Sequence, residues 1–185
     1  MRKVLYILGQ LDDADVEWLA TNGQRQKLAK GSVVIQNGVR SENLYIVIDG
    51  RLAVVLPNGF KLAEVGVGEI LGEISLVISS PPTASVVVEE DCVVLAVSQL
   101  KLRKQLQRDA AFAGRFYRAL AVFLANRMRS TLSTLGYGNA PAAGPGKAIA
   151  DEDDEQDADL LDDEVLDEVY NAGLRFERLL KKLAQ

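Results

Sequence analysis

Residues 70–76 read Ile-Leu-Gly-Glu-Ile-Ser-Leu, and residues 81–86 read Pro-Pro-Thr-Ala-Ser-Val. This segment is the best guide to the fold and to the candidate site of the chain. The Pro81-Pro82 pair stiffens the loop, because each proline ring fixes its own φ and restricts the residue before it. A stiff loop favours a fixed shape over one that reorders when a ligand binds.

Short β-branched runs lie on both sides of this segment. They are punctuated by Gly, Asn and Asp at regular intervals, which is typical of an antiparallel sandwich or barrel. The Asn58-Gly59 pair is a strong hairpin signal. The predicted strands are 33–35, 44–48, 52–56, 60–65, 84–89 and 92–97.

Two glycine motifs precede the segment. Residues 31–38 read Gly-Ser-Val-Val-Ile-Gln-Asn-Gly, and residues 44–52 read Leu-Tyr-Ile-Val-Ile-Asp-Gly-Arg-Leu. Glycine at a strand corner supplies positive φ or room for a sharp turn, so any all-β domain could carry such glycines. The three motifs together, in this order and spacing, resemble the cyclic nucleotide-binding domain family, the module of catabolite-activator proteins and kinase regulatory subunits. The resemblance covers residues 8–135.

The resemblance implies a fold that is mainly β with helices. We expect an antiparallel β-roll, jelly-roll-like (a double-stranded β-helix), with an N-terminal helix and a long C-terminal helix. The residues agree, since Asp12 or Asp13 can cap a short helix that ends near Asn22-Gly23. From Asp109 to Leu135 the apolar period becomes helical.

The helix predicted over 109–135 carries one wide apolar stripe. A stripe with three phenylalanines is wider than one roll needs, so we predict a homodimer through it. The alternative is that the stripe packs only on its own roll. The residues assigned to the dimer helix are Phe112, Phe116, Leu120, Phe123, Leu124 and Met128.

The family uses the segment around residues 70–86 as a phosphate-binding cassette. The resemblance implies a short helical turn whose amides face the phosphate, with Glu73 accepting from the ribose 2′-hydroxyl and Ser85 donating to the phosphate. The alternative is that Glu73 only caps its own turn. The ligand-binding residues assigned by resemblance are Gly72, Glu73, Ile74, Ser75, Leu76, Pro82, Thr83, Ala84 and Ser85.

Pro82 departs from the family, which carries an arginine at this position to hold the cyclic phosphate. Proline supplies neither charge nor an N–H group. Hydrogen bonds to charged groups contribute about 1.5–3 kcal/mol, so we expect cAMP or cGMP to bind about 10- to 150-fold more weakly than with arginine. Compensation from Arg40, Arg51 or Arg127 stays an open alternative. A cyclic nucleotide is the one cofactor that the resemblance implies.

The C-terminal part differs in charge from the rest. Residues 151–185 carry 4 basic and 13 acidic residues, against 17 and 13 in residues 1–150. We predict a cyclic-nucleotide-binding-like domain over 1–135, a flexible Gly/Pro/Ala and acidic linker over 136–159, and an amphipathic interaction helix over 160–185. The residues assigned to contact a protein partner are Leu166, Val169, Phe176, Leu180 and Leu183.

The acidic run before this helix has two interpretations. Asp151 to Glu168 holds twelve acids and no base, whereas Lys101 to Arg129 holds eight bases and one acid. The acidic run could lie on the basic segment as an autoinhibitory tail, screened by salt. Alternatively, both segments are solvated faces.

Composition argues against several classes of protein. The chain has no histidine, which removes the commonest general base and the usual metal ligand, so we assign no catalytic or metal-binding residue. A single cysteine, Cys92, fits a buried core position and a reducing compartment. An acidic tail is repelled by DNA phosphates, so we expect no direct DNA binding.

No apolar run approaches the length of a membrane span, and we expect a cytoplasmic protein. Its predicted role is that of a non-catalytic regulator or adaptor with weak or no cAMP or cGMP binding. The alternative is a genuine sensor of a cyclic nucleotide or another small molecule at the cassette.

Overall fold

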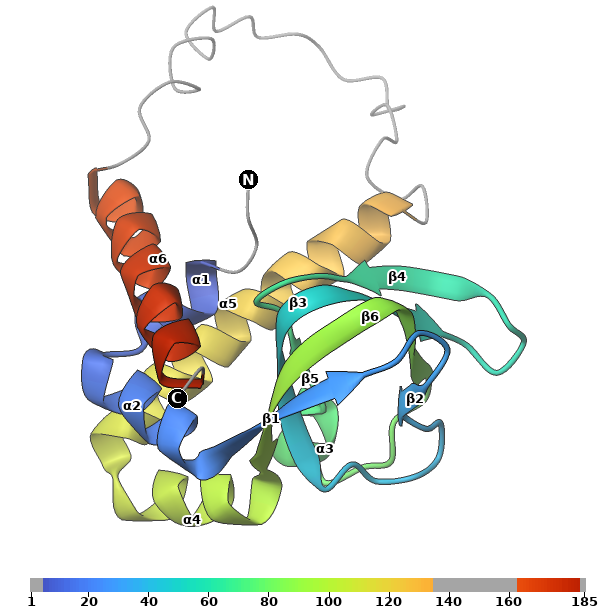
Figure 1. Cartoon of the computed structure of the whole chain (residues 1–185), viewed down its shortest axis with the longest axis horizontal. Helices are drawn as coiled ribbons and strands as arrows, with labels where there is room; N and C mark the ends of the chain where they lie inside the picture. The colour runs from blue at the N-terminus through green and yellow to red at the C-terminus, as the bar shows by residue number, and fades with distance from the viewer. Residues whose placement is uncertain (1–4, 135–162, 184–185) are drawn as a thin grey trace, which may run out of the picture.

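The computed structural model describes residues 5–134 and 163–183, which form a β-roll with most of the helices gathered beside it (Figure 1). The strands are β1 (Gly23–Leu28), β2 (Val33–Ile35), β3 (Asn43–Val55), β4 (Lys61–Val65), β5 (Ile70–Leu71) and β6 (Ser85–Ser98). The helices are α1 (Leu5–Gln10), α2 (Asp13–Asn22), α3 (Glu73–Val77), α4 (Gln99–Arg108), α5 (Ala110–Thr134) and α6 (Asp163–Leu183). The predicted mainly β fold, an antiparallel roll flanked by helices, is confirmed.

Strands β3 and β6 form the centre of the sheet. The strand order is β1-β6-β3-β4, while β2 also pairs with β6 and β5 with β3, and every pair is antiparallel. The predicted hairpin at Asn58-Gly59 joins β3 to β4. There the Gly59 N–H donates to the Leu56 carbonyl at 2.9 Å, and Gly59 has a φ of +81°.

The predicted turn at Asp49-Gly50 is wrong. The sequence predicts separate strands over 44–48 and 52–56, whereas β3 runs continuously through Gly50. An added Cβ at Gly50, whose φ is +85°, would lie 2.4 Å from the carbonyl oxygen of Asp91 on β6. The register also shifts here, so this glycine marks a bulge between two closely approaching strands.

Other boundaries also differ from the prediction. The predicted strands 84–89 and 92–97 are one strand, β6. The sequence pattern does not predict β1, because its residues Gly-Gln-Arg-Gln-Lys-Leu are mostly polar, yet each pairs with β6. The sequence likewise does not predict helices α1 and α4, because the apolar pattern in each is short.

Helix α2 begins and ends where the sequence predicts. The Asp12 carboxylate accepts from the N–H of Asp15 at 2.8 Å, and the Asp15 carboxylate accepts from the N–H of Asp12 at 2.9 Å. This reciprocal cap stabilises the first turn. Asp15 is also bound by Arg115 of α5 at 2.6 Å. Burial opposes ionisation of Asp15, but these donors lower its pKa overall.

Helix α5 turns most of the predicted dimer stripe inward. Phe112, Phe116, Leu120 and Phe123 are 1%, 2%, 3% and 5% exposed and share a core with the roll and the N-terminal helices. Leu124 is half-buried. Met128 is 64% exposed. The wide stripe is therefore accounted for largely by packing within one chain.

Helix α6 packs on α1 and α2 of the same chain (Figure 1). Ala172 and Leu179 are buried there. Three of the residues predicted to contact a partner pack against the same core, namely Phe176, Leu180 and Leu183. The side chains of Leu166 and Val169 lie outside the described part of the structure, as do the predicted linker and the acidic run before Asp163.

Charged contacts fix this arrangement. Arg175 donates to the carbonyl oxygens of Leu8 at 3.1 Å and Gly9 at 2.9 Å, near the end of α1. It also contacts Asp13 at 3.2 Å, and Arg178 pairs with the same carboxylate. Helix α6 therefore holds α1 and α2 together.

None of the helices in the described part of the chain combines the length and apolar character needed to cross a membrane.

Cys92 is buried in the roll, and burial raises the pKa of its thiol to about 11. That side chain serves as core packing.

Candidate ligand pocket

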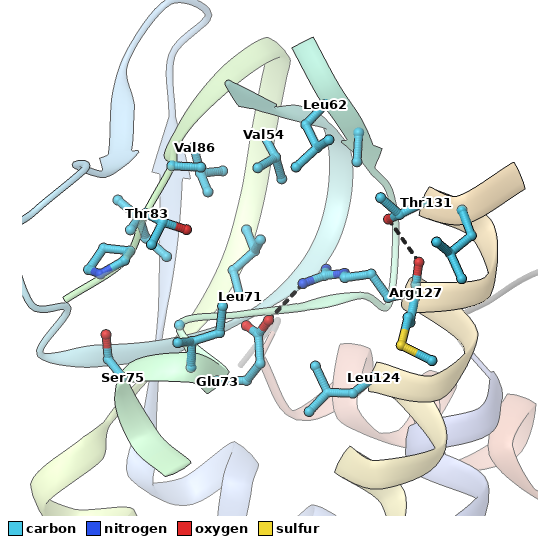
Figure 2. A pocket seen from close by; sticks show the side chains of 18 residues that line it. Val54, Leu62, Leu71, Glu73, Ser75, Thr83, Val86, Leu124, Arg127 and Thr131 are labelled. Atoms are coloured by element: carbon cyan, nitrogen blue, oxygen red, sulfur yellow. Dashed lines mark hydrogen bonds and ion pairs between the residues drawn. The ribbon is translucent and has the colours of Figure 1, made fainter. Parts of the chain in front are cut away.

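A cavity of about 360 Å³ lies between the roll, α3 and the C-terminal half of α5 (Figure 2). Most of its wall is apolar. The lining residues are Ile35, Val54, Leu62, Ala63, Leu71, Gly72, Glu73, Ile74, Ser75, Pro82, Thr83, Ala84, Val86, Leu124, Arg127, Met128, Thr131 and Leu132.

Helix α3 provides one side of the pocket, and Gly72 is its N-cap residue. This residue has a φ of +87°, and an added Cβ would lie 2.6 Å from the carbonyl oxygen of Asn43, so glycine is required. Side chains of α4 hold the short helix in place. Gln99 donates to the Gly72 carbonyl at 3.0 Å, and Arg103 donates to the Ser75 carbonyl at 2.8 Å.

Glu73 forms an ion pair with Arg127 of α5. Figure 2 shows the Arg127 side chain extending toward Glu73, with Nη1 2.8 Å from Oε1. The Glu73 side chain is 5% exposed and that of Arg127 is 22% exposed. Arg127 also donates to the Ile70 carbonyl at 3.0 Å, and its guanidinium lies 4.3 Å from the ring centre of Phe123.

Burial is the main influence on the Glu73 carboxyl and raises its pKa above the usual range. Arg127 and the backbone N–H groups of Glu73 and Gly72 act in the opposite direction, because they stabilise the carboxylate. The side-chain partner of the Glu73 carboxylate among the described residues is Arg127.

Arg127 is the cation that sequence reasoning left open among three candidates. Arg51 instead pairs with Glu90 and Glu64 at the exposed end of the roll. Arg40 is not among the lining residues. Glu73 and Arg127 are 54 positions apart in the chain, and only the packing of α5 against the roll brings them together.

Seven of the nine cassette residues predicted from the sequence line the pocket, and Leu76 and Ser85 do not. Leu76 is buried in the core beneath α3. The Ser85 hydroxyl accepts from the backbone N–H of Asn37 at 3.1 Å. Pro82 lies in the pocket wall, and its carbonyl oxygen accepts from the N–H of Gly38 at 2.8 Å.

The residues assigned to ligand binding include none from α5, although the sequence leaves Arg127 open as a compensating cation. Arg127 and Thr131 line the pocket, and so do Leu124 and Met128, which were assigned to the dimer helix. Their spacing of three and four residues is the signal of one helix face. Among the described lining residues, Glu73 and Arg127 are the only charged ones, so the lining carries no net charge.

The roll, the largely apolar pocket and the short helix at the pocket wall define a β-roll domain with a candidate small-molecule site. Residues 25–109 match the family model of the cyclic nucleotide-binding domain. This segment of the chain belongs to that family.

The chain is also similar to parts of longer curated proteins. Over 118 residues the chain is 27% identical to an uncharacterized NTE family protein of Mycobacterium tuberculosis, a match covering 64% of this chain and 20% of that protein. Over 95 residues it is 33% identical to a cAMP-dependent protein kinase regulatory subunit of Eremothecium gossypii, covering 51% and 20%. The chain thus spans about a fifth of the length of these two curated relatives.

A solved structure shows the same fold. The cyclic nucleotide-binding domain from Methylobacillus flagellatus superimposes with a TM-score of 0.66 at 19% identity, covering 76% of this chain and 85% of that one.

Proposed function

We propose that this chain is a non-catalytic regulatory domain in which a small molecule in the pocket controls the position of α5. Its affinity for cAMP and cGMP is weak or absent. One observation carries this proposal: Arg127, the one cation among the described lining residues, is already paired with Glu73 at 2.8 Å.

Charge balance is the physical reason for weak nucleotide binding. A cyclic phosphate would bring a second negative charge next to Glu73, which is 5% exposed. Pro82 adds no compensating charge. If the phosphate competed with Glu73 for Arg127, one of the two anions would be left without a partner in an apolar cavity. An unpaired buried charge is strongly destabilising.

The same ion pair supports the regulatory part of the proposal. Arg127 belongs to α5, and its two acceptors, Glu73 and the Ile70 carbonyl, belong to the roll. A ligand that changes either contact alters how α5 sits on the roll. Occupation of the pocket is thereby linked to the helix whose outer face is available to partners.

Titration calorimetry with cAMP and cGMP tests the proposal. We expect dissociation constants well above the micromolar range for both nucleotides. A sub-micromolar constant for either one would show that the pocket neutralises the phosphate after all.

We also propose that α5 forms a homodimer, but through its outer face rather than through the buried phenylalanines. On this face Met128 and Leu132, which also line the pocket, are 64% and 43% exposed, and Ala121 and Ala125 are exposed too. Spacings of four, three and four residues match the seam of a two-helix coiled coil.

For α6 we propose contact with a protein partner. Its inner face is occupied by α1 and α2, while Leu174 is 46% exposed on the other side. A partner therefore either uses the outer face or displaces the helix. Deletion of residues 163–185 should abolish partner binding, and a partner that still binds the shortened chain would exclude this role.

A further inference from the structure

The walls of the pocket offer a ligand few free polar groups. Leu71, Val54 and Val86 of the roll lie across the cavity from Leu124 of α5 (Figure 2). Two of the three hydroxyl groups in the described lining have partners within the chain, and the third belongs to Thr83. Thr131 donates to the Arg127 carbonyl at 2.9 Å, and Ser75 donates to the Ser80 carbonyl at 3.1 Å.

The two charged groups in the wall neutralise each other. An anionic ligand would give the site two negative charges and one positive, and a cationic ligand the reverse. A neutral ligand is the one class that enters without leaving a charge unbalanced in an apolar cavity. Glu73 keeps acceptor capacity beyond its contact with Arg127, because a carboxylate has about four lone-pair positions.

We infer that the pocket binds an uncharged, largely apolar small molecule that donates one hydrogen bond to the Glu73–Arg127 pair. This inference rests on the proposed regulatory function and adds the chemical class of the ligand. The cavity of about 360 Å³ lies within the range of small-molecule sites.

Fluorescence of the neutral probe N-phenyl-1-naphthylamine, excited directly, tests the location on the full chain. We expect enhanced emission with the wild-type protein and at least a tenfold loss of affinity in Leu124→Trp, which fills the cavity. The matched control is Leu100→Trp on α4, where Leu100 is 65% exposed and outside the lining. Equal binding by the two variants would place the probe elsewhere and overturn the inference.

Displacement of the probe by 1-decanol and by decanoate tests the charge class. The two molecules have the same chain length and differ in charge, and both are used below micelle-forming concentrations. We expect decanol to displace the probe at a concentration at least tenfold lower. Equal potency of decanoate on the wild-type protein would refute the neutral class.

Two variants separate the effect of the pocket charge from the greater water solubility of decanoate. Glu73→Gln leaves Arg127 as an unbalanced cation, so the affinity for decanoate relative to that for decanol should rise at least tenfold. Arg127→Gln leaves the anion, so the same ratio of affinities should fall. Whether each variant folds is judged by thermal unfolding, and an unchanged ratio in a folded variant would contradict the inference.

The outcomes for the two proposals are distinguishable. Tight displacement of the probe by cAMP would defeat the proposed weak nucleotide affinity. If neither the probe nor decanol binds, and cAMP does not bind either, the inferred neutral ligand class is refuted while the proposed weak nucleotide affinity is retained.

Discussion

At the scale of single residues, the proposed selectivity of the pocket depends on the Glu73–Arg127 pair and on Pro82. On an exposed surface an ion pair contributes little to stability. Glu73 is 5% exposed, so its charge must be balanced by a group that the fold supplies. The wall position held by Pro82 supplies no charge, and Arg127 alone carries that role among the described lining residues.

Restoring the missing arginine should improve nucleotide binding. For Pro82→Arg we expect cAMP affinity to rise about 10- to 150-fold, since a charge-assisted contact contributes about 1.5–3 kcal/mol. Titration calorimetry measures this. Pro81→Arg, at the exposed neighbouring position, adds the same charge outside the wall and should have little effect.

Removal of the Arg127 guanidinium should destabilise the folded protein, because the buried Glu73 carboxylate loses its partner. For Arg127→Met we expect a loss of about 3 kcal/mol in the free energy of unfolding at pH 7, the low end for breaking a buried pair, since Arg127 is 22% exposed. Urea unfolding measures it. Arg129→Met, at an exposed site on the same helix, is the control and should be close to neutral.

The pH dependence of this loss has a definite sign. The pKa of Glu73 is raised in the folded state, so its ionisation lowers stability as pH rises from about 4.5 through the folded value. Without Arg127 the pKa rises further. The difference in the free energy of unfolding between Arg127→Met and the wild type should therefore shrink as pH falls toward 4.5. A difference that stays constant with pH would exclude Glu73 as its source.

At the scale of elements, the β3–β6 ladder depends on one glycine. Because a Cβ at Gly50 would lie 2.4 Å from the Asp91 carbonyl, Gly50→Ala should destabilise the protein by at least about 3 kcal/mol. Gly38→Ala is the matched control, since Gly38 has a φ of +75° but nothing within 4 Å of the added atom. It should cost about 1–2 kcal/mol, and equal losses in urea unfolding would argue against the close approach.

Arg175 of α6 donates hydrogen bonds both to α1 and to the first residue of α2. Arg175→Ala removes donors to two α1 carbonyls and to Asp13, so backbone hydrogen exchange over residues 171–183 should accelerate. Lys181→Ala, at an exposed position, should leave exchange unchanged. Arg178 and Arg175 lower the pKa of Asp13, so this contact should persist above pH 3.8 and weaken below it.

At the scale of the whole molecule, dimerisation should respond to the outer face of α5. We expect Ala125→Glu to shift the sedimentation equilibrium toward monomer, because it places like charges at the seam. Ala111→Glu, exposed in the first turn of the same helix, is the control. A wild-type monomer at micromolar concentration would leave no role for this face in self-association.

The sequence by itself determined the elements whose signals are local. The Asn58-Gly59 hairpin and the cap at Asp12 depend on neighbouring residues, and the structure confirms both. The β-branched runs also lie in strands, but the predicted breaks within β3 and β6 are wrong. Polar β1 was unpredictable for the opposite reason, since it is a strand only because β6 lies beside it.

The tertiary structure decided which surfaces face each other. Arg127 meets Glu73 across 54 positions, the phenylalanines of α5 turn toward their own roll, and the inner face of α6 lies on α1 and α2. An amphipathic pattern specifies that a face is buried but does not specify against what, because any apolar surface gives nearly the same burial energy. Only the packed chain fixes the partner of each face, and with it the charge of the pocket.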